Sequence, residues 1–306
     1  MQTDHGNTSP AIPPDHALDR LYISKYLFQL RATTEIRLVP FKGSAFHGGF
    51  GHALKKISPL YCEEIFGPGQ KNTLPRPFVL LPPLDRDTRY EPGRTFNCEL
   101  TLFGSAHRHF SLCHAALDFL GRQMGLGSGR GKYSIEDVHT ARPPTDIATA
   151  PDTTPTSGRD IAAARSRLLT GRRLTLHLPT RLRLKAEGRL MRQAPPFNIF
   201  FARLLGRLNT LAVTYGTGKL TTREQRDSLL ARAGDIQLTD NQTTWQDLPR
   251  YSGRQQSRMK FGGLLGSITY EGDLQPFLPY LALGEWTHTG GKTSFGLGKY
   301  VMERND

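Results

Sequence analysis

Both halves of the chain end in the same five-residue pattern. This repetition limits the folds that the chain can adopt. Residues 125–133 read GLGSGRGKY and residues 290–300 read GGKTSFGLGKY, so both end in G-x-G-K-Y before a short strand-like run. Because the pattern stands at the same point of each half, it indicates an internal duplication more than a chance recurrence. The fold must therefore be one that a unit of about 150 residues can build twice.

Each half also opens in the same way, on an alternating run that is followed by a helical one. Apolar and polar residues alternate over 26–39 and 173–186, as in half-buried strands, although Pro179 interrupts the second run. Apolar residues then recur at spacings of three and four over 44–57 and 197–216, which predicts two amphipathic helices. Strand, helix, further strands and a closing strand is the order of a ferredoxin-like unit. We therefore predict an α+β chain of tandem ferredoxin-like (RRM-like) domains with a C-terminal glycine-rich loop.

The two halves meet in the stretch ARPPTDIATAPDTTPTSGRD, residues 141–160. It is rich in proline, threonine and alanine, has no aromatic residue and shows neither helical nor strand periodicity. We predict a linker or long loop at 141–160, between an N-terminal domain at 21–140 and a C-terminal domain at 161–306. Residues 1–20 are expected to be disordered.

Composition removes several classes of protein. The three cysteines, Cys62, Cys98 and Cys113, include no C-x-x-C pair, so a disulfide framework and a thiolate zinc site are both excluded. No run of about 18 apolar residues is present, and the first residues lack the basic start and apolar core of a signal peptide. We expect a soluble protein of the cytoplasm with no membrane partner.

Positive charge is concentrated in the middle of the chain. The sequence has 40 Lys and Arg against 27 Asp and Glu, a net charge of +13. Eleven basic residues and one acidic residue, Glu187, lie between Arg165 and Arg207. Release of counterions from phosphates drives the binding of such a segment to a polyanion. The alternative is a solvated cationic face that serves solubility.

The basic residues at 181–185 have the spacing of a phosphate-binding strand. Arg181, Arg183 and Lys185 alternate with leucines, so their side chains lie about 6.5 Å apart on one face. An ordinary amphipathic strand would have the same pattern. Arg203 and Arg207 are expected on the polar face of the following helix, as an extension of the same patch. The predicted binding residues are Arg172, Arg173, Arg181, Arg183, Lys185, Arg189, Arg192, Arg203, Arg254 and Arg258.

The terminal glycine loop fails as a nucleotide-binding motif. Trp286 stands where a P-loop needs its first glycine, and too few residues remain after the loop for the helix that a P-loop or Rossmann motif requires. What remains is a flexible loop whose exposed N–H groups hold a backbone phosphate with the help of Lys292. The glycines concerned are Gly290, Gly291, Gly296 and Gly298. A tight turn with positive φ explains only some of them.

Histidines offer acid–base chemistry for RNA cleavage, which needs a base for the 2′-OH, an acid for the leaving 5′-oxygen and a cation for the phosphorane. On the predicted helix 44–57, His47 and Lys55 lie near one another around the helix axis and Gly51 leaves room between them. His52 lies further round, and His288 stands beside the glycine loop. A structural role for each histidine is the competing interpretation. Motifs of metal-dependent or acyl-transfer enzymes are absent, so no metal and no cofactor are predicted.

Taken together, these residues resemble a known family. The runs GGLLGSITYEG at 262–272, PFLPYLALGE at 276–285, His288 and GGKTSFGLGKY are similar to the C-terminal domain of CRISPR-associated protein 6. These proteins are precursor-RNA processing endoribonucleases of the RAMP superfamily. The segments YSGRQQ at 251–256 and GSAFHGGFGHAL at 43–54 are similar to other blocks of that family.

The resemblance implies that the chain binds a CRISPR repeat hairpin in a basic groove and cleaves precursor crRNA at the hairpin base. It implies metal-independent cleavage that leaves a 2′,3′-cyclic phosphate and a 5′-OH. A histidine on the first helix is the general base in many relatives, and by position this is His47. Lys55, His52 and Tyr26 are then the candidate acids or charge stabilisers, while Lys292 and the loop glycines hold RNA. Other Cas effector subunits are the implied protein partners, in a prokaryotic cytoplasm.

Two other functions remain open at this stage. A non-catalytic RAMP-type subunit would bind crRNA in an effector complex through the same fold and basic patch, without a reacting histidine. A general RNA-binding protein with two sheet platforms would need RNP-type aromatic motifs, and neither half has one. Cleavage of repeat RNA in EDTA separates the enzyme from the binding subunit.

Overall fold

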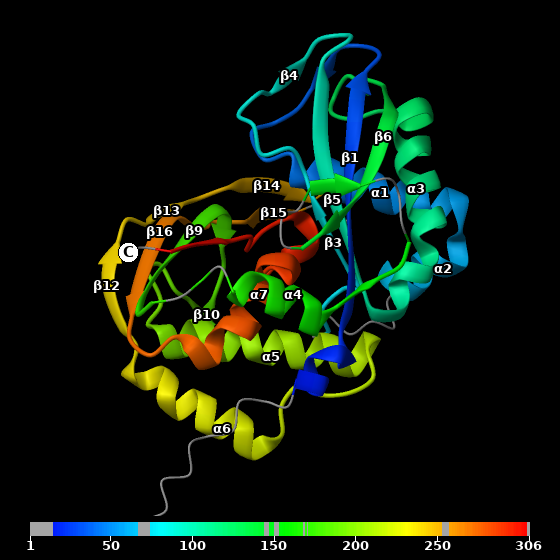
Figure 1. The fold of residues 1–306 in the computed structure, drawn as a ribbon. Coiled ribbons are helices and arrows are strands. Elements are labelled where there is room, and N and C mark those ends of the chain that lie inside the picture. The colour runs from blue at the N-terminus through cyan, green and yellow to red at the C-terminus, as the bar shows by residue number, and fades with distance from the viewer. Residues whose placement is uncertain are drawn as a thin grey trace, which may run out of the picture.

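Two antiparallel sheets, each with its own helices, make up the protein (Figure 1). The computed structural model describes residues 15–66, 74–143, 147–149, 153–167, 169, 171–252 and 257–304. In the first half the elements are η1 Asp15–Arg20, β1 Tyr22–Ala32, β2 Ile36–Arg37, α1 Gly43–Ile57, α2 Pro59–Phe66, β3 Phe78–Leu81, β4 Arg89–Tyr90, β5 Thr95–Phe103, η2 Gly104–His109, α3 Phe110–Phe119, η3 Leu120–Met124, β6 Tyr133–Arg142, β7 Ile147–Thr149 and β8 Thr156–Ser157.

The second half repeats this order with longer insertions between its strands. Its elements are α4 Gly158–Ser166, β9 Arg173–Leu182, β10 Lys185–Ala186, β11 Arg189–Leu190, α5 Phe197–Tyr215, α6 Arg223–Arg232, η4 Ala233–Asp235, β12 Gln237–Asn241, β13 Thr244–Gln246, β14 Pro249–Ser252, β15 Ser257–Lys260, β16 Gly263–Glu271, η5 Gln275–Phe277, α7 Leu278–Thr287, η6 Thr293–Phe295 and β17 Val301–Arg304.

Sheet topology confirms the predicted ferredoxin-like fold. The main strands of the first sheet run β3-β5-β1-β6, and those of the second run β12-β16-β9-β17. In each sheet the opening strand is central, between the strand before the second core helix and the strand that closes the half. Neighbouring strands pair antiparallel in both sheets. This is the βαββαβ arrangement, built twice.

The alternation in the opening strands places one side of each sheet in a helix-covered core. Tyr26 and Phe28 of β1 belong to the apolar cluster that α1 and α3 cover, and Leu176 and Leu178 of β9 belong to the cluster under α5 and α7. Strand side chains alternate between faces, so the odd-numbered residues of β1 and β9 lie on the other face. In β9 this second face carries Arg181 and Arg173.

The repeated G-x-G-K-Y pattern makes the same contacts twice. The tyrosine hydroxyl of each copy is buried and donates to a carbonyl of the preceding helix, Tyr133 to Leu117 O at 2.8 Å and Tyr300 to Leu281 O at 2.6 Å. The backbone N–H of the preceding lysine donates in each copy to a threonine Oγ1 at 2.8 Å. Equal roles at equal positions support the duplication inferred from the sequence.

The two halves pack closely against each other. Within the second half, helix α4 packs on α7 near the middle of the molecule (Figure 1). Across the halves, the ammonium of Lys25 on β1 lies 4.1 Å from the Trp286 ring centre on α7. One continuous apolar cluster includes Ile23, Val79 and Phe103 of the first half together with the core of the second. The second half therefore depends on side chains of the first.

Two segments have more structure than their composition suggested. Within 141–160, β7 pairs with β6, β8 pairs with β1, and Ser157 caps α4 by accepting from Asp160 N–H at 3.1 Å. Residues 15–20, expected to be disordered, form η1, in which Leu18 is buried. Backbone pairing to β6 and to β1 orders β7 and β8, and burial of Leu18 holds η1. Such contacts produce no periodicity in the sequence. Residues 1–14 lie outside the described residues.

Candidate functional site

His47 lies where the glycine-rich loop of the second half meets helix α1 of the first. Its imidazole is half-buried and stacks on the Phe295 ring of η6, with 3.6 Å between ring centres and 14° between planes. Helix α1 begins at Gly43, where a Cβ would lie 2.4 Å from the carbonyl oxygen of Phe295. The glycine therefore allows the helix to approach the loop closely enough for the two rings to stack.

The glycine loop is packed between the halves, which corrects the expectation of a flexible loop with exposed N–H groups. Gly291 N–H donates to Arg183 O at 2.8 Å, and Gly298 N–H donates to Arg181 O at 3.1 Å. Residues 293–298 are buried, and a Cβ on Gly296 would lie 2.6 Å from Pro82. These contacts explain why so many glycines are needed. Gly291 and Lys292 form the exposed part of the loop.

Two cations flank an aromatic ring beside this loop. The Arg183 guanidinium lies 5.8 Å and the Lys292 ammonium 5.7 Å from the centre of the Phe261 ring. Phe261 meets Phe295 edge to face at 5.3 Å. A row of contacts therefore runs from the cations through two aromatic rings to His47. Arg183 also donates to Gly262 O.

The basic surface continues along the edge of the second sheet. Arg181 donates to Gln246 Oε1 at 3.3 Å, and the Arg192 guanidinium lies 5.0 Å from the Trp245 ring centre. Burial lowers the pKa of both Arg181 and Arg183, since desolvation disfavours the charged form. Cations interleaved with aromatic rings suit a nucleic-acid strand, because phosphates and bases can both be contacted.

Other predicted binding residues lie apart from this surface. Arg173 is eight residues from Arg181 on β9, about 26 Å at strand spacing, and Arg172 precedes it. Arg203 is exposed on α5, in the helix layer. Lys185 and Arg189 are exposed on the β10–β11 hairpin.

Two predicted residues have no described side chain, and two cations of the central segment have internal partners. Arg254 lies outside the described residues, and Arg258 is described as backbone of β15 only. Arg165 forms an ion pair with Glu285 at 2.8 Å. Arg207, expected on the polar face of its helix, is directed inward, where Nη2 donates to Thr287 O at 2.9 Å.

The remaining acid–base candidates differ in accessibility. Lys55 and His52 are exposed on α1. Lys55 follows His47 by just over two turns and lies about 80° round the helix axis from it, whereas His52 lies about 140° round from His47. Tyr26 is completely buried and stacks on Phe110 with 4.0 Å between ring centres. A tyrosine in that position cannot reach a bound strand, so Tyr26 is wrong as a candidate acid.

His288 is a structural residue, which corrects its prediction as a reacting group. The side chain is 2 % exposed and its Nδ1 lies 3.1 Å from Leu297 O. Burial lowers the pKa of His288 well below its ordinary value, with further lowering by the charge of Lys299. A neutral imidazole shielded from solvent holds the end of α7 against the loop.

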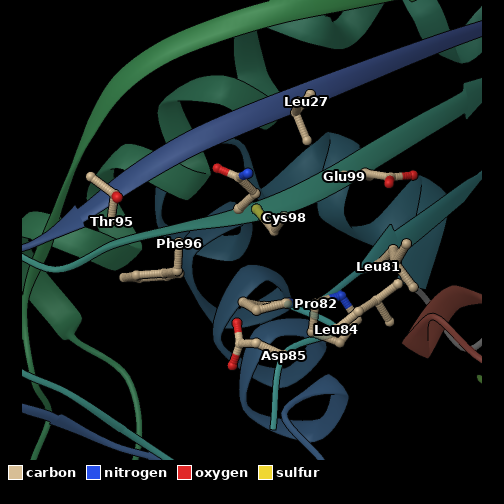
Figure 2. A pocket seen from close by; sticks show the side chains of 11 residues that line it. Leu27, Leu81, Pro82, Leu84, Asp85, Thr95, Phe96, Cys98 and Glu99 are labelled. Atoms are coloured by element: carbon tan, nitrogen blue, oxygen red, sulfur yellow. The ribbon is translucent and has the colours of Figure 1, made fainter. Parts of the chain in front are cut away.

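A hollow of about 380 Å³ lies on the first sheet, and Figure 2 shows its lining. Leu27 of β1, Glu99 of β5 and Asp85 after β3 contribute to it. Asp85 is in an ion pair with Lys42 at 2.6 Å, and Glu99 with Lys299 at 3.3 Å. Its carboxylates are therefore neutralised from within the protein. We assign no chemistry to this hollow.

Sequence reasoning missed the aromatic part of the site. No role is predicted from the sequence for Phe295, Phe261 and Trp245, although Phe295 stands between the glycines of the loop and Phe261 directly before Gly262. A large ring next to a glycine was the available signal, because the glycine permits a second segment to approach that ring. Within the described ranges, no group of three or more His, Cys, Asp or Glu residues is arranged to hold a metal ion, and none of the helices there could span a membrane.

Family models match both halves. A model named AF_1859_N, described as an N-terminal domain, matches residues 21–161, and the model of CRISPR-associated endoribonuclease Cas6 matches residues 174–300. The second half of the chain is therefore identified as a Cas6 domain. A search of curated proteins gave no match.

Solved Cas6 structures share the fold over nearly the whole chain. The Cas6 (TTHB231) product complex matches with a TM-score of 0.65 and 17 % identity over 92 % of this chain and 100 % of that one. Thermus thermophilus Cas6 (TTHB231) matches at 0.62 and 18 %, over 92 % and 99 % of the two chains. The partial Cas6-RT-Cas1--Cas2 complex matches at 0.67 and 15 %, over 96 % of this chain and 47 % of that one. Both the duplication and the domain packing thus have precedents in Cas6.

Proposed function

We propose that this protein binds the hairpin of a CRISPR repeat and cleaves precursor crRNA at the base of that hairpin without a metal ion. The observation that carries the proposal is the stack of His47 on Phe295, because it places a titratable group next to the loop that bears Lys292. An imidazole is suited to proton transfer near neutral pH, and a neighbouring cation stabilises a phosphorane.

In the proposed reaction His47 acts as general base. It removes the proton of the 2′-OH, the 2′-oxygen attacks the adjacent phosphorus, and the bond from phosphorus to the 5′-oxygen breaks. A proton from a general acid goes to the leaving oxygen, so the products are a 2′,3′-cyclic phosphate and a 5′-OH. Lys55, two turns along α1, is the preferred acid, and the exposed His52 is the alternative.

We assign RNA binding to residues of the second half. Arg181, Arg183 and Lys292 supply cations for successive phosphates, and Trp245 with Arg192 offers an aromatic and cationic surface for a base. Arg172, Arg173, Lys185, Arg189 and Arg203 are secondary candidates, because the fold distributes them over other surfaces. Other Cas effector subunits are the proposed protein partners, in the cytoplasm of a prokaryote.

The test is cleavage of a labelled repeat RNA in EDTA. Cutting at one site, abolished by a 2′-deoxy substitution there, is the expected result. His47→Ala should reduce the single-turnover rate by about 10² or more while RNA affinity stays within about threefold. His16→Ala, an exposed histidine in η1, is the matched control and should cut at the wild-type rate. Tight binding without any product would replace this proposal by that of a binding subunit, and normal cutting by His47→Ala would move the base to His52.

A further inference from the structure

Phe295 meets the face of His47 from the opposite half of the molecule. The distance between these ring centres is 3.6 Å, shorter than the distances from the imidazole to Phe66, at 5.4 Å, and to Phe78, at 5.9 Å. A stack covers the face of the imidazole, whereas both ring nitrogens lie on its edge. The contact therefore restrains rotation of the ring, whose Nε2 is buried, and so fixes the plane in which both nitrogens lie.

The position of Phe295 is fixed by the turn that carries it. Phe295 N–H donates to Lys292 O at 3.0 Å, which closes the one-turn helix η6. The φ angle of Lys292 is +66°, a left-handed conformation at the start of this turn. Gly43 and Gly296 bring α1 and the segment after β3 against the same turn. Because the turn joins Lys292 to Phe295 by a backbone hydrogen bond, we expect a displacement of Lys292 to move Phe295 as well.

We propose that Phe295 is a positioning residue that sets the plane of the His47 imidazole, so that the loop holding the RNA also orients the general base. This rests on the proposed function. The physical reason is that the proposed base, His47, lies on the first half, whereas Lys292 and the other proposed phosphate-binding residues lie on the second. Element η6 is in contact with both groups. Reaction rates depend steeply on such alignment, and a misplacement of about 1 Å can cost about 10²-fold.

Three substitutions separate positioning from simple packing. Phe295→Leu keeps an apolar side chain and removes the ring, and Phe295→Tyr restores the ring. Leu297→Ala removes apolar packing from the same loop and cluster but keeps both rings of the stack. The measurements are single-turnover cleavage, RNA affinity, thermal midpoint and the NMR signal of the His47 Hε1 proton, identified by its loss in His47→Ala.

Phe295→Leu should cut about 10- to 100-fold more slowly with RNA affinity within about threefold, and its Hε1 signal should lose the ring-current shift caused by Phe295. Phe295→Tyr should restore both the rate and the signal. Leu297→Ala should lower the thermal midpoint at a nearly normal rate. A normal rate in Phe295→Leu, or a loss of rate matched by Leu297→Ala at equal stability, would overturn the proposal.

The NMR measurement keeps this proposal distinct from the proposed function. If His47→Ala cuts normally, the assignment of the base fails whatever Phe295 does. If the wild type cuts no RNA, an unmoved Hε1 signal in Phe295→Leu refutes the stack, and a displaced signal supports the restraint on the imidazole.

Discussion

Replacing Arg207 by methionine should destabilise the protein strongly, although the residue lies in a segment that is basic enough to suggest a surface. The Arg207 guanidinium donates to two carbonyl oxygens at the end of α7, Thr287 O at 2.9 Å and His288 O at 3.1 Å, and lies 5.9 Å from the Phe103 ring centre. Burial lowers the pKa of Arg207 to about 10, so the group remains charged at neutral pH.

The expected loss in the free energy of unfolding follows from the carbonyl groups that Arg207→Met leaves without a donor. Methionine fills much of the same volume, so the main loss is the donor to two buried carbonyls, each costing about 1–3 kcal/mol when left unsatisfied. The carbonyl end of a helix also favours a cation. Together these give a loss of about 3–5 kcal/mol in the free energy of unfolding.

Urea denaturation at pH 7 measures this loss as a shift of the midpoint at constant m-value. Arg203→Met, one turn earlier on α5 and exposed, is the matched control and should change the free energy of unfolding by less than about 0.5 kcal/mol. A change below about 1 kcal/mol in Arg207→Met would show that the guanidinium does not hold the end of α7, and the reasoning would be refuted.

Two further predictions concern charge. Because burial lowers the pKa of His288 well below its ordinary value, the unfolded state binds the proton more readily as pH falls below about 6.5, and the wild type should lose stability from this group between pH 7 and pH 5, by at most about 1.4 kcal/mol per pH unit. Urea titrations at several pH values should show this loss removed in His288→Asn and retained in His52→Gln. RNA affinity of Arg183→Ala should have a shallower dependence on salt by about one phosphate contact, whereas Arg223→Ala, at an exposed position on α6, should match the wild type. An equal dependence of RNA affinity on salt in Arg183→Ala and in the wild type would show that Arg183 does not contact a phosphate.

Most of the fold could be predicted because its signals are local and occur twice. The alternation at 173–186 and the apolar spacing at 197–216 correspond to β9 and α5, and the repeated G-x-G-K-Y pattern predicted two units of one topology. The short strands at 147–149 and 156–157 could not be predicted. The first is ordered by a hairpin with β6 and the second by pairing with β1, which lies far earlier in the chain, and their own residues carry no pattern.

The site could be predicted only in part, because only some of its signals are local in the sequence. His47 follows from its place on an amphipathic helix, but its partner Phe295 is almost 250 residues away, and no spacing rule connects them. The inward direction of Arg207 and the burial of His288 depend on how α5 meets the end of α7. Net charge locates a basic segment, and only packing decides which of its cations face solvent.

The apolar cluster that joins the halves has a consequence for how the protein can be divided. Ile23, Val79 and Phe103 lie in the same cluster as the core of the second half, so neither half could be produced alone without uncovering that surface to water. We expect a protein made from either half alone to expose this apolar surface and to aggregate.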